Sequence, residues 1–422
     1  MTKTLTGLFF LLVLVLPAAA QQGTEDLHLS FYGFIRNEIF VDTYKGLDAA
    51  YELFYLVPLY AGQDAEGKDI NRQISANLSA LATRMGMRVE GPEVFGASTR
   101  ANIEFDFGGI VKTEPTLFRI RQAWVAFRWE KTRLLAGQSW HPFLGGDLFP
   151  SVAGLNTGAP FQAFNRSPQL RFDRYAGNFI FTAAAVYENQ YASKTMESAG
   201  FSSANQAQRN GVMPELVLVA GYRKNGLNLG AGAQLKRLKP RMTTSGTSGT
   251  YVADEYLTSG GVMAYLGCKK GRLNLTAKGY YGQNMTHLTL LGGYGVASRN
   301  ETTGRETYTN YTNYSAYMNL VYGSRWQGGM TLGYGKNLGT GDPLYDDGSG
   351  QATVGGLLPN VMDVARLAPH LALNVANIRL VAEYELTTAR YGTGEIDFSD
   401  GLYAVRHRTT NNRFMLMMMY VF

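Results

Sequence analysis

Hydrophobic and polar residues alternate along most of this chain in segments of about ten residues, separated by clusters of turn-forming residues. In the last segment, Phe414, Leu416, Met418, Tyr420 and Phe422 share one face at a period of two, which a helix cannot produce. Such alternation predicts β-strands with one apolar face. We expect sixteen strands, over residues 29–42, 74–89, 98–108, 117–129, 133–140, 169–176, 178–188, 214–223, 227–238, 255–268, 272–283, 312–323, 326–336, 362–374, 377–387 and 411–422.

The connections between these segments fall into two classes that alternate along the chain. One class is short, at 90–97, 130–132, 176–178, 224–226, 269–271, 324–325 and 374–377. The other is longer, at 43–73, 109–116, 141–168, 189–213, 239–254, 284–311, 337–361 and 388–410. Short turns on one rim and long loops on the other are typical of a transmembrane barrel. We therefore predict an all-β, closed antiparallel transmembrane barrel, because an open sheet edge would leave backbone groups unpaired in lipid.

The first twenty residues have a different pattern. Lys3 precedes an apolar run, and Pro17-Ala18-Ala19-Ala20 follows it, which predicts a cleaved secretory signal peptide at 1–20. No later stretch approaches the roughly 18 apolar residues that a spanning helix needs. We expect 21–422 to form a single barrel domain in contact with membrane lipid, in the outer membrane of a Gram-negative bacterium.

Charged residues gather on one face of the predicted strands. In 98–108, for example, Arg100, Glu104 and Asp106 alternate with apolar residues. An Arg or Lys facing mid-bilayer lipid costs about 2–4 kcal/mol, so the charged faces should line the lumen. The predicted pore-lining residues are Arg36, Arg84, Arg88, Arg100, Arg119, Arg121, Arg171, Arg379, Glu104 and Asp106, with Arg366, Lys278, Glu38, Glu90, Asp173, Glu383 and Glu385 as further candidates.

The excess of arginine predicts a preference for anions, because the guanidinium group is always charged and pairs with carboxylate or phosphate. The alternative is that arginines and acids form cross-strand pairs that stiffen the wall. Arg119 and Arg121 form the clearest pair, at successive inward positions. The outward face after them, from Ala123 to Trp129, requires a bulge near Gln122.

The connection 141–167 is rich in Gly, Pro and Phe, which is an unusual composition for a loop in water. We expect it to pack inside the barrel and narrow the pore, with His141, Phe143, Asp147, Phe149 and Arg166 as candidate constriction residues. Opposed charges there would set a transverse field across the pore. The alternative is that it covers the outer rim or a neighbouring subunit.

The features above together resemble the trimeric outer-membrane porins. An apolar closing strand with Phe414, Tyr420 and Phe422 resembles the signal that directs such barrels to the outer-membrane insertion machinery. The stretches from Phe118 to Val125 and from Gly137 to Phe143 resemble the porins of Bacteroidota and the dicarboxylate-channel (DcaP-like) family. This resemblance implies a homotrimer, an inward third loop and passive uptake of small, mainly anionic solutes through an arginine-lined pore.

One departure from the porin pattern is the run Met415, Met417 and Met419, which puts apolar residues where lumen polar residues are expected. We expect these methionines to pack under a loop or under the N-terminal segment.

Other function classes find little support in the sequence. The lone cysteine, Cys268, excludes a disulfide framework, and the net charge of +6 is too mild to indicate nucleic acid as a partner. The five histidines show no metal-ligand spacing and no Gly-x-Ser-x-Gly motif occurs, so we expect no enzyme, metal or cofactor. Besides the diffusion porin, two hypotheses stay open: a substrate-specific channel for dicarboxylates, other organic anions or saccharides, and a non-transport adhesin or scaffold.

Overall fold

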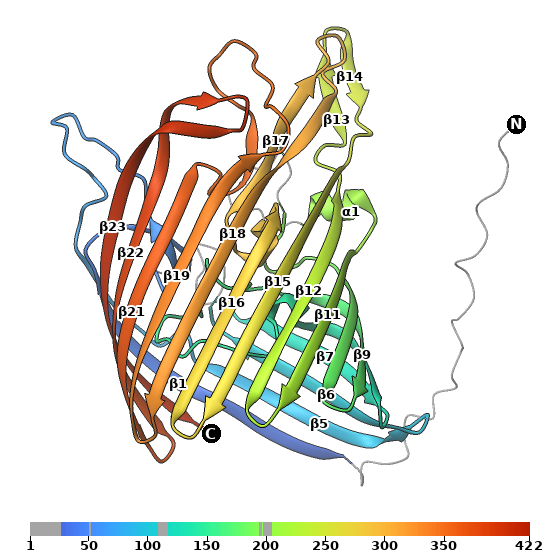
Figure 1. Cartoon of the computed structure of the whole chain (residues 1–422), viewed down its shortest axis with the longest axis vertical. Coiled ribbons are helices and arrows are strands. Elements are labelled where there is room, and N and C mark those ends of the chain that lie inside the picture. The colour runs from blue at the N-terminus through green and yellow to red at the C-terminus, as the bar shows by residue number, and fades with distance from the viewer. Residues whose placement is uncertain (1–26, 50–51, 109–116, 194–195, 197–204) are drawn as a thin grey trace, which may run out of the picture.

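The computed structural model describes residues 27–49, 52–108, 117–193, 196 and 205–422, and it confirms a closed antiparallel barrel of 16 strands (Figure 1). The predicted signal peptide and the connection 109–116 lie outside the described residues. The barrel strands are β1 (His28–Asp42), β5 (Arg84–Val94), β6 (Ala97–Asp106), β7 (Arg119–Arg128), β8 (Thr132–Trp140), β9 (Arg166–Ala176), β10 (Phe179–Val186), β11 (Glu215–Lys224), β12 (Leu227–Leu238), β15 (Leu257–Lys270), β16 (Leu273–Gln283), β18 (Glu306–Gly323), β19 (Trp326–Thr340), β21 (Val361–Val375), β22 (Ile378–Asp397) and β23 (Leu402–Val421).

The first and last strands close the barrel. β1 pairs antiparallel with β23 in a register that places Phe34 opposite Val421 and Asp42 opposite Arg413. At the end of this seam, Gly33 and Phe422 exchange backbone hydrogen bonds of 3.0 and 3.1 Å. β1 then pairs with β5 on its other side, so neither terminal strand of the barrel leaves a free edge. Among the described residues, no helix is long and apolar enough to cross a membrane.

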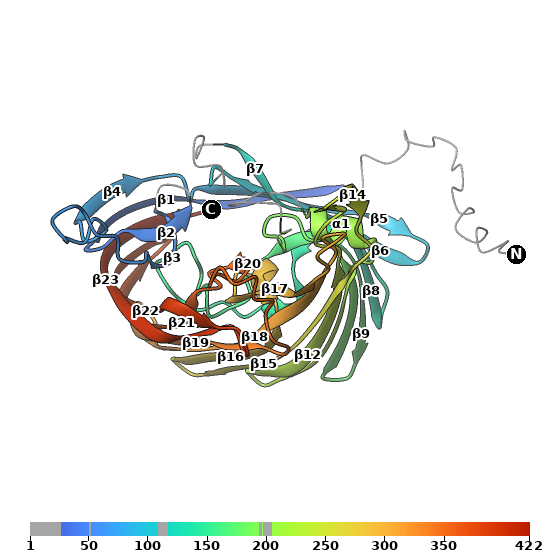
Figure 2. The same ribbon diagram turned by 90° about the horizontal axis from the view of Figure 1, so that it is seen from above.

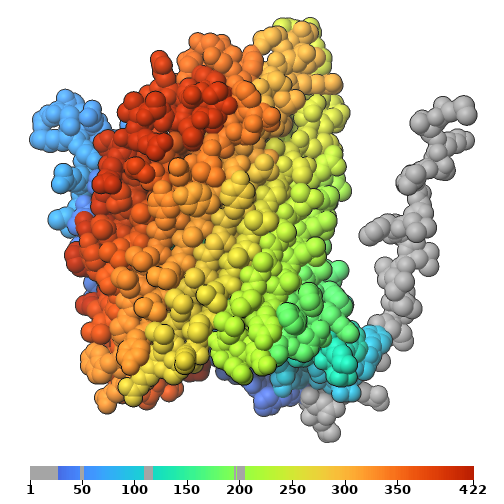
Figure 3. All heavy atoms as spheres, viewed as in Figure 1, coloured from blue at the N-terminus to red at the C-terminus, as the bar shows by residue number. Residues whose placement is uncertain are grey.

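Side chains sort by face as the alternation predicts. On β23, Phe414, Leu416, Met418 and Tyr420 are about half exposed on the outside of the barrel, as is the terminal Phe422. The space-filling view shows the strands from β11 to β23 packed into one outer wall (Figure 3). The three candidate assembly residues Phe414, Tyr420 and Phe422 therefore lie on the outer surface of the barrel.

The predicted bulge is present at Arg121. Ile120 pairs with Phe105 and Gln122 pairs with Glu104, so Arg121 is the extra residue on β7. The bulge restores the outward face of the following residues, because one inserted residue reverses the side to which each later side chain points.

The connections between the barrel strands carry small elements of their own. These are β2 (Gly46–Ala49), β3 (Phe54–Pro58), β4 (Ser75–Ser79), η1 (Pro142–Leu144), α1 (Gln206–Gly211), β13 (Thr243–Gly246), β14 (Gly249–Val252), η2 (Met285–Leu288), β17 (Gly292–Arg299) and β20 (Val354–Leu357). Among them, β13, β14 and β17 lie toward the rim opposite the C-terminus (Figure 1). β4 continues the line of β5 along β1, so the predicted strand 74–89 is interrupted at 80–83.

Several predicted loop boundaries are wrong; β18, for example, begins at Glu306 instead of residue 312. The segment 388–410 is not a long loop, because β22 and β23 continue as a paired hairpin as far as Asp397 and Leu402. Ala389 and Tyr391 are buried on the inner face of this hairpin, but Arg390, Arg406 and Arg408 replace the apolar residues expected on the outer face, and this hides the alternation. The connection 141–167 ends earlier than predicted, because Arg166 already pairs with Trp140 as the first residue of β9.

The inward methionines of β23 pack under the inward-folded loops, as expected. Met415 and Met417 are 4% and 5% exposed and lie in one cluster with Ala153 and Leu155 of the connection 141–165 and with Leu53 of the first long loop. The apolar inner face of β23 thus supports two loops, and Met417 and Met419 also line a cavity of about 610 Å³ inside the barrel.

We expect Met417→Ala to destabilise the folded barrel by about 2–5 kcal/mol, because it leaves a cavity under the loops. Met418→Ala, on the outer face of the same strand, is the matched control and should destabilise the barrel less. Urea-induced unfolding in lipid vesicles measures both. Equal losses for the two variants would contradict the packing of Met417 under the loops.

Candidate functional site

The connection 141–165 folds into the barrel, as predicted, and we call it the constriction loop. Lys278 of β16 donates to the carbonyl oxygens of Leu144 and Leu148 and to Gln162 Oε1, the last at 2.9 Å. Farther along, Glu383 of β22 accepts from the backbone N–H of Ala153 at 2.8 Å. The loop is thus held across the lumen, from β16 to β22, by charged side chains of the inner wall.

A second loop, 43–73, also enters the lumen, which the sequence analysis did not predict. The segment from Leu53 to Val57 is 0–6% exposed, and β3 contacts β22 and β23 inside the ring seen from above (Figure 2). Asn156 of the constriction loop donates to the carbonyl of Tyr55 at 2.7 Å, which joins the two loops. The apolar run 53–57 within a long loop was the signal that could have revealed this.

Several predicted pore-lining cations anchor these loops. Arg366 donates to the carbonyl oxygens of Ala159 at 2.8 Å and of Leu56 at 2.6 Å, and so contacts both loops. Arg36 donates to Ala153 O and pairs with Glu38. Arg366 also lies 3.2 Å from Glu385. Both cations that hold the loops are thus paired with an acid of the inner wall.

Arg119 and Arg121 point into the lumen as predicted, but both are paired with acids of β6. Arg119 Nε lies 2.6 Å from Asp106, and Arg121 bridges Glu104 and Asp106 at 2.7 Å each. Arg84 lies 3.9 Å from Glu104 and completes the group. We call these five residues the β5–β7 charge cluster.

The other candidate arginines lie in different surroundings. Arg171 shares Asp173 with Arg133, each at 2.8 Å. At the short-turn end, Arg100 pairs with Glu90 at 3.0 Å in an exposed position, and Arg88 stacks over the ring of Tyr32. Arg166 is fully buried and stacks over the ring of Trp140. Arg379 donates hydrogen bonds to Gln327, Asn374 and Ser151.

Arg166 and Arg379 differ from the paired arginines. Neither has a carboxylate within ion-pair distance among the residues that the structure describes. Both terminal nitrogens of Arg166 are buried without a hydrogen-bond partner among those residues. Their charges are therefore not balanced by a direct neighbour.

The constriction residues do not converge on one point. Phe143 is fully buried against Tyr280 and Met285, and half-exposed Phe149 packs edge-on against Trp140. Asp147 is exposed and lines a small cavity of about 50 Å³ together with Arg171 and Arg223. Arg166, the first residue of β9, is close enough for its charge to act on Glu104 and Asp106 of the β5–β7 charge cluster.

A cavity of about 610 Å³ lies inside the barrel between the constriction loop and the short-turn rim, and we call it the vestibule. Its charged lining consists of Arg36, Lys269, Arg272 and Arg379, and no Asp or Glu is among the described residues that line it. Lys269 and Arg272 flank the β15–β16 turn, so this rim of the lumen is basic.

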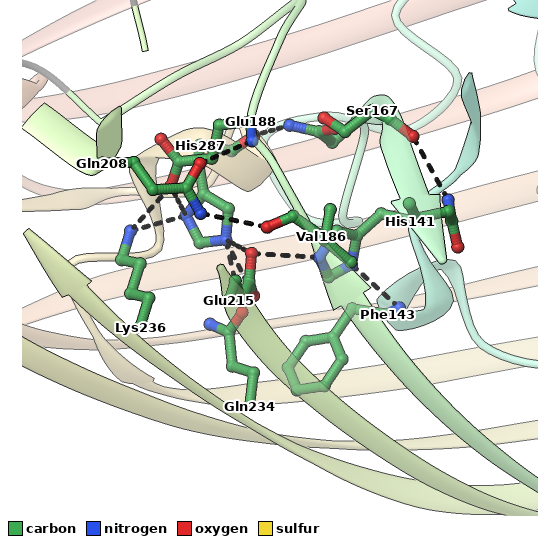
Figure 4. Close-up of polar contacts among 12 residues, drawn as sticks. His141, Phe143, Ser167, Val186, Glu188, Gln208, Glu215, Gln234, Lys236 and His287 are labelled. Atoms are coloured by element: carbon green, nitrogen blue, oxygen red, sulfur yellow. Dashed lines mark hydrogen bonds and ion pairs between the residues drawn. The ribbon is translucent and has the colours of Figure 1, made fainter. Parts of the chain in front are cut away.

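His141, Glu215 and His287 meet between the start of the constriction loop, β11 and η2 (Figure 4), where their nitrogen and oxygen atoms lie within 4.8 Å of one another. Two His and one Glu can hold zinc. However, Nδ1 of His141 accepts the N–H of Phe143 at 3.1 Å, and Nδ1 of His287 lies 2.8 Å from the Lys236 ammonium, which can only donate. Neutral imidazoles in this arrangement carry their protons on Nε2, so neither offers a lone pair to a metal. The sequence spacing of these residues gave no sign of the cluster.

Comparison with solved structures finds this fold in outer-membrane proteins. The outer membrane channel DcaP of Acinetobacter baumannii superposes with a TM-score of 0.65 at 16% sequence identity, covering 95% of this chain and 99% of that chain. OmpT of Vibrio cholerae gives 0.54 at 11% identity, covering 95% and 99%. An anion-selective porin from Comamonas acidovorans gives 0.52 at 9% identity, covering 94% and 100%. No family model and no curated protein sequence matches the chain.

We expect Asp106→Asn to destabilise the barrel by about 3–5 kcal/mol, because it leaves Arg119 and Arg121 buried without their shared counter-charge. Glu90→Gln, which breaks the exposed pair with Arg100, should cost no more than about 1 kcal/mol. Denaturant unfolding in vesicles gives both values. A small loss for Asp106→Asn would show that the β5–β7 charge cluster is solvated.

Proposed function

We propose that this protein is an outer-membrane channel for small hydrophilic solutes, with a preference for anions. In this proposal residues 1–20 direct export and are removed, and 21–422 form the barrel domain. The closed 16-stranded wall is the feature that suits a channel, since a barrel of this size can hold an aqueous path.

The observation that carries the anion preference is the charge of the vestibule. Four cationic side chains face a cavity of about 610 Å³ that has no acidic lining residue among those described. Arg36 is paired with Glu38 beside the cavity, so Lys269, Arg272 and Arg379 carry the positive excess. In a low-dielectric wall, charges of one sign raise the local concentration of the opposite ion. Arg379, one of these four, keeps its full positive charge, because its described hydrogen-bond partners are neutral amides and a hydroxyl.

The predicted pair Arg119 and Arg121 has a different part in this proposal. Because Glu104 and Asp106 offset most of their charge, we assign them mainly to the shape of the wall. The β5–β7 charge cluster nevertheless carries three cations and two anions, and nearby Arg166 adds a further cation. The lumen there keeps a positive excess that also favours anions.

Two inward loops favour a selective channel over a wide diffusion pore. The loop 43–73 and the constriction loop join through Asn156 and Tyr55 and share Arg366 as an anchor. A lumen narrowed from two sides brings each solute closer to the wall charges. A substrate-specific channel for organic anions is therefore the second candidate function.

The similar structures support these assignments only by the names that they carry. One is named an outer membrane channel and another an anion-selective porin. One structure of OmpT of Vibrio cholerae is named a trimer form. We propose a homotrimer for this protein as well, inserted through recognition of the strand that ends at Phe422.

The proposal is tested by the reversal potential of single channels in planar bilayers under a KCl gradient. For the unmodified protein we expect a reversal potential whose sign shows that chloride permeates more readily than potassium. Replacing Arg272 and Arg379 together by Ala should lower chloride preference by about two- to threefold at 0.1 M salt, where exposed charges act over about 10 Å. The matched control is the double change Glu90→Gln and Arg100→Gln, which removes a balanced, exposed pair at the short-turn end and should change the chloride preference less.

Two results would contradict the proposal. If no channel opens at any voltage, the protein is not a pore, and the adhesin or scaffold hypothesis gains support. If channels open but the vestibule variant keeps the original selectivity, the vestibule arginines do not set the anion preference.

A further inference from the structure

Charged residues cross the outer face of β19, β21, β22 and β23, toward the ends of these strands that lie at the rim opposite the C-terminus (Figure 1). Lys336 of β19, Asp363 of β21, Arg390 of β22 and Arg408 of β23 lie opposite one another in register. Arg406 lies two residues from Arg408 on β23 and points to the same side. We call these five residues the outer basic patch.

The alternation along β23 shows that the outer basic patch faces away from the lumen. Asn411 and Arg413 point into the barrel and are buried, whereas Phe414 is 54% exposed on the outside. Arg406 and Arg408 share the face of Phe414 and are exposed as well. The charges of the patch are therefore separate from those of the vestibule.

The patch carries more positive than negative charge. Asp363 lies 2.7 Å from Nε of Arg390, and within the described part of the chain no second acid lies within ion-pair distance of the four cations. Four cations and one acid leave a net charge of +3. Arg390 and Arg408 are also direct cross-strand neighbours, and like charges in that arrangement destabilise a sheet. A bound anion would offset this repulsion.

The outer face of β22 and β23 changes in composition along the strands. It is apolar on β23 from Phe422 to Phe414. Next, Tyr384 of β22 donates to Asn412 of β23 at 2.7 Å, and an aromatic ring with a polar tip is typical of the border between hydrocarbon and headgroups. Arg408 lies beyond this border, so the patch begins where the apolar wall has ended.

Strand geometry gives the depth of the patch in the bilayer. At about 3.3 Å per residue and a tilt of about 40°, the apolar run from Phe414 to Phe422 covers roughly 20 Å along the membrane normal. Arg408 lies roughly 15 Å beyond Phe414 on the same scale. Because the apolar band of such barrels is about 25 Å tall, Arg408 reaches roughly 10 Å past its edge, where lipid headgroups lie.

The position and the charge of the patch together select its partner. The short turns of such barrels face the periplasm, so the patch faces the outer leaflet. Guanidinium groups bind phosphate oxygens through bidentate, charge-assisted hydrogen bonds, and basic clusters beside a membrane attract anionic headgroups. A single phosphodiester cannot balance a net charge of +3, which favours a lipid with two phosphate groups. The exposed Phe414 and Leu416 on the same face offer a surface for its acyl chains.

We propose that the outer basic patch binds a diphosphorylated glycolipid of the outer leaflet, of the lipid A type. Arg406, Arg408 and Lys336 donate to its phosphate oxygens, and its acyl chains lie along the apolar face that ends at Phe414. The bound phosphates screen Arg390 from Arg408 and so stabilise the part of the β22–β23 hairpin outside the hydrocarbon. Because the patch faces away from the lumen, this inference rests on the outer-membrane location and is independent of the channel function.

The test is native mass spectrometry of the protein in detergent, titrated with diphosphoryl lipid A or with phosphatidylglycerol. We expect the unmodified protein to bind lipid A more tightly than phosphatidylglycerol, which has a single phosphate. Arg406→Gln together with Arg408→Gln should weaken lipid A binding by about tenfold, because two charge-assisted contacts are lost. Both residues are exposed and have no side-chain partner among the described residues, so these changes should leave folding intact.

Arg174→Gln together with Lys224→Gln is the matched control. These two cations are exposed on the outer face near short turns, so their loss removes the same charge from the opposite rim. Lipid A binding should be largely unchanged in this variant. Replacing Arg406 and Arg408 by Lys keeps the charge without the bidentate fork, and should give an intermediate affinity.

Several results would overturn the proposal. One is lipid A binding by the glutamine variant of the patch that is as tight as in the unmodified protein, and another is an equal loss in the matched control. Equally tight binding of phosphatidylglycerol would show that the patch takes a single phosphate. If the patch variant keeps lipid A but its subunits separate, the patch is a contact between copies of this chain.

The channel function is tested separately by the reversal potential. Because the patch lies outside the lumen, the patch variant should keep the reversal potential of the unmodified protein. Loss of lipid A binding in the patch variant, with no channel activity in any form of the protein, would reject the channel function alone.

Discussion

The pairing of β1 with β23 is the constraint on which the rest of this structure depends. Lipid offers no hydrogen-bond partner to a backbone group, so a sheet can span the bilayer only if its edges meet. Once they meet between Phe34–Asp42 and Arg413–Val421, every strand has one face toward lipid and one toward the lumen. The charges of a chain that is 17% Asp, Glu, Lys and Arg must then be accommodated largely inside the barrel or at its rims.

This crowding of charge explains how the loops are held. Arg366 and Lys278 find backbone carbonyls on the inward loops, and Glu383 finds backbone N–H groups there. The backbone groups of the loops and the charged side chains of the wall form hydrogen bonds with each other. Apolar side chains such as Met417 and Leu155 fill the space between the loops and the wall. The lumen is therefore a packed polar core with a basic vestibule below it, and the inward loops are part of its stability.

The sequence was most informative where a pattern is local. Alternation at a period of two located all sixteen strands and even the bulge at Arg121, because each strand must present one apolar face to lipid. Loop contacts could not be predicted in this way. The entry of Leu53–Val57 into the lumen depends on partners more than a hundred residues away, such as Asn156 and Arg366. The hairpin 388–410 escaped notice because strands outside the membrane need no apolar face.

For the charged residues of the candidate site, too, the direction of a side chain could be predicted from the local pattern, but its partners could not. That Arg119 and Arg121 point inward followed from the pattern, but their partners depended on the register between β6 and β7. The cluster of His141, Glu215 and His287 joins the root of the constriction loop, a barrel strand and the loop helix η2, so no spacing in the chain could reveal it. The start of the loop is fastened by the imidazole of His141, which caps η1, and by the backbone hydrogen bond from His141 to Asn165. The far end of the loop is held by the carboxylate of Glu383, which accepts the backbone N–H groups of Ala153 and Gly154. Polar side chains thus fix the loop at both places, and apolar packing fills the space between the loop and the wall.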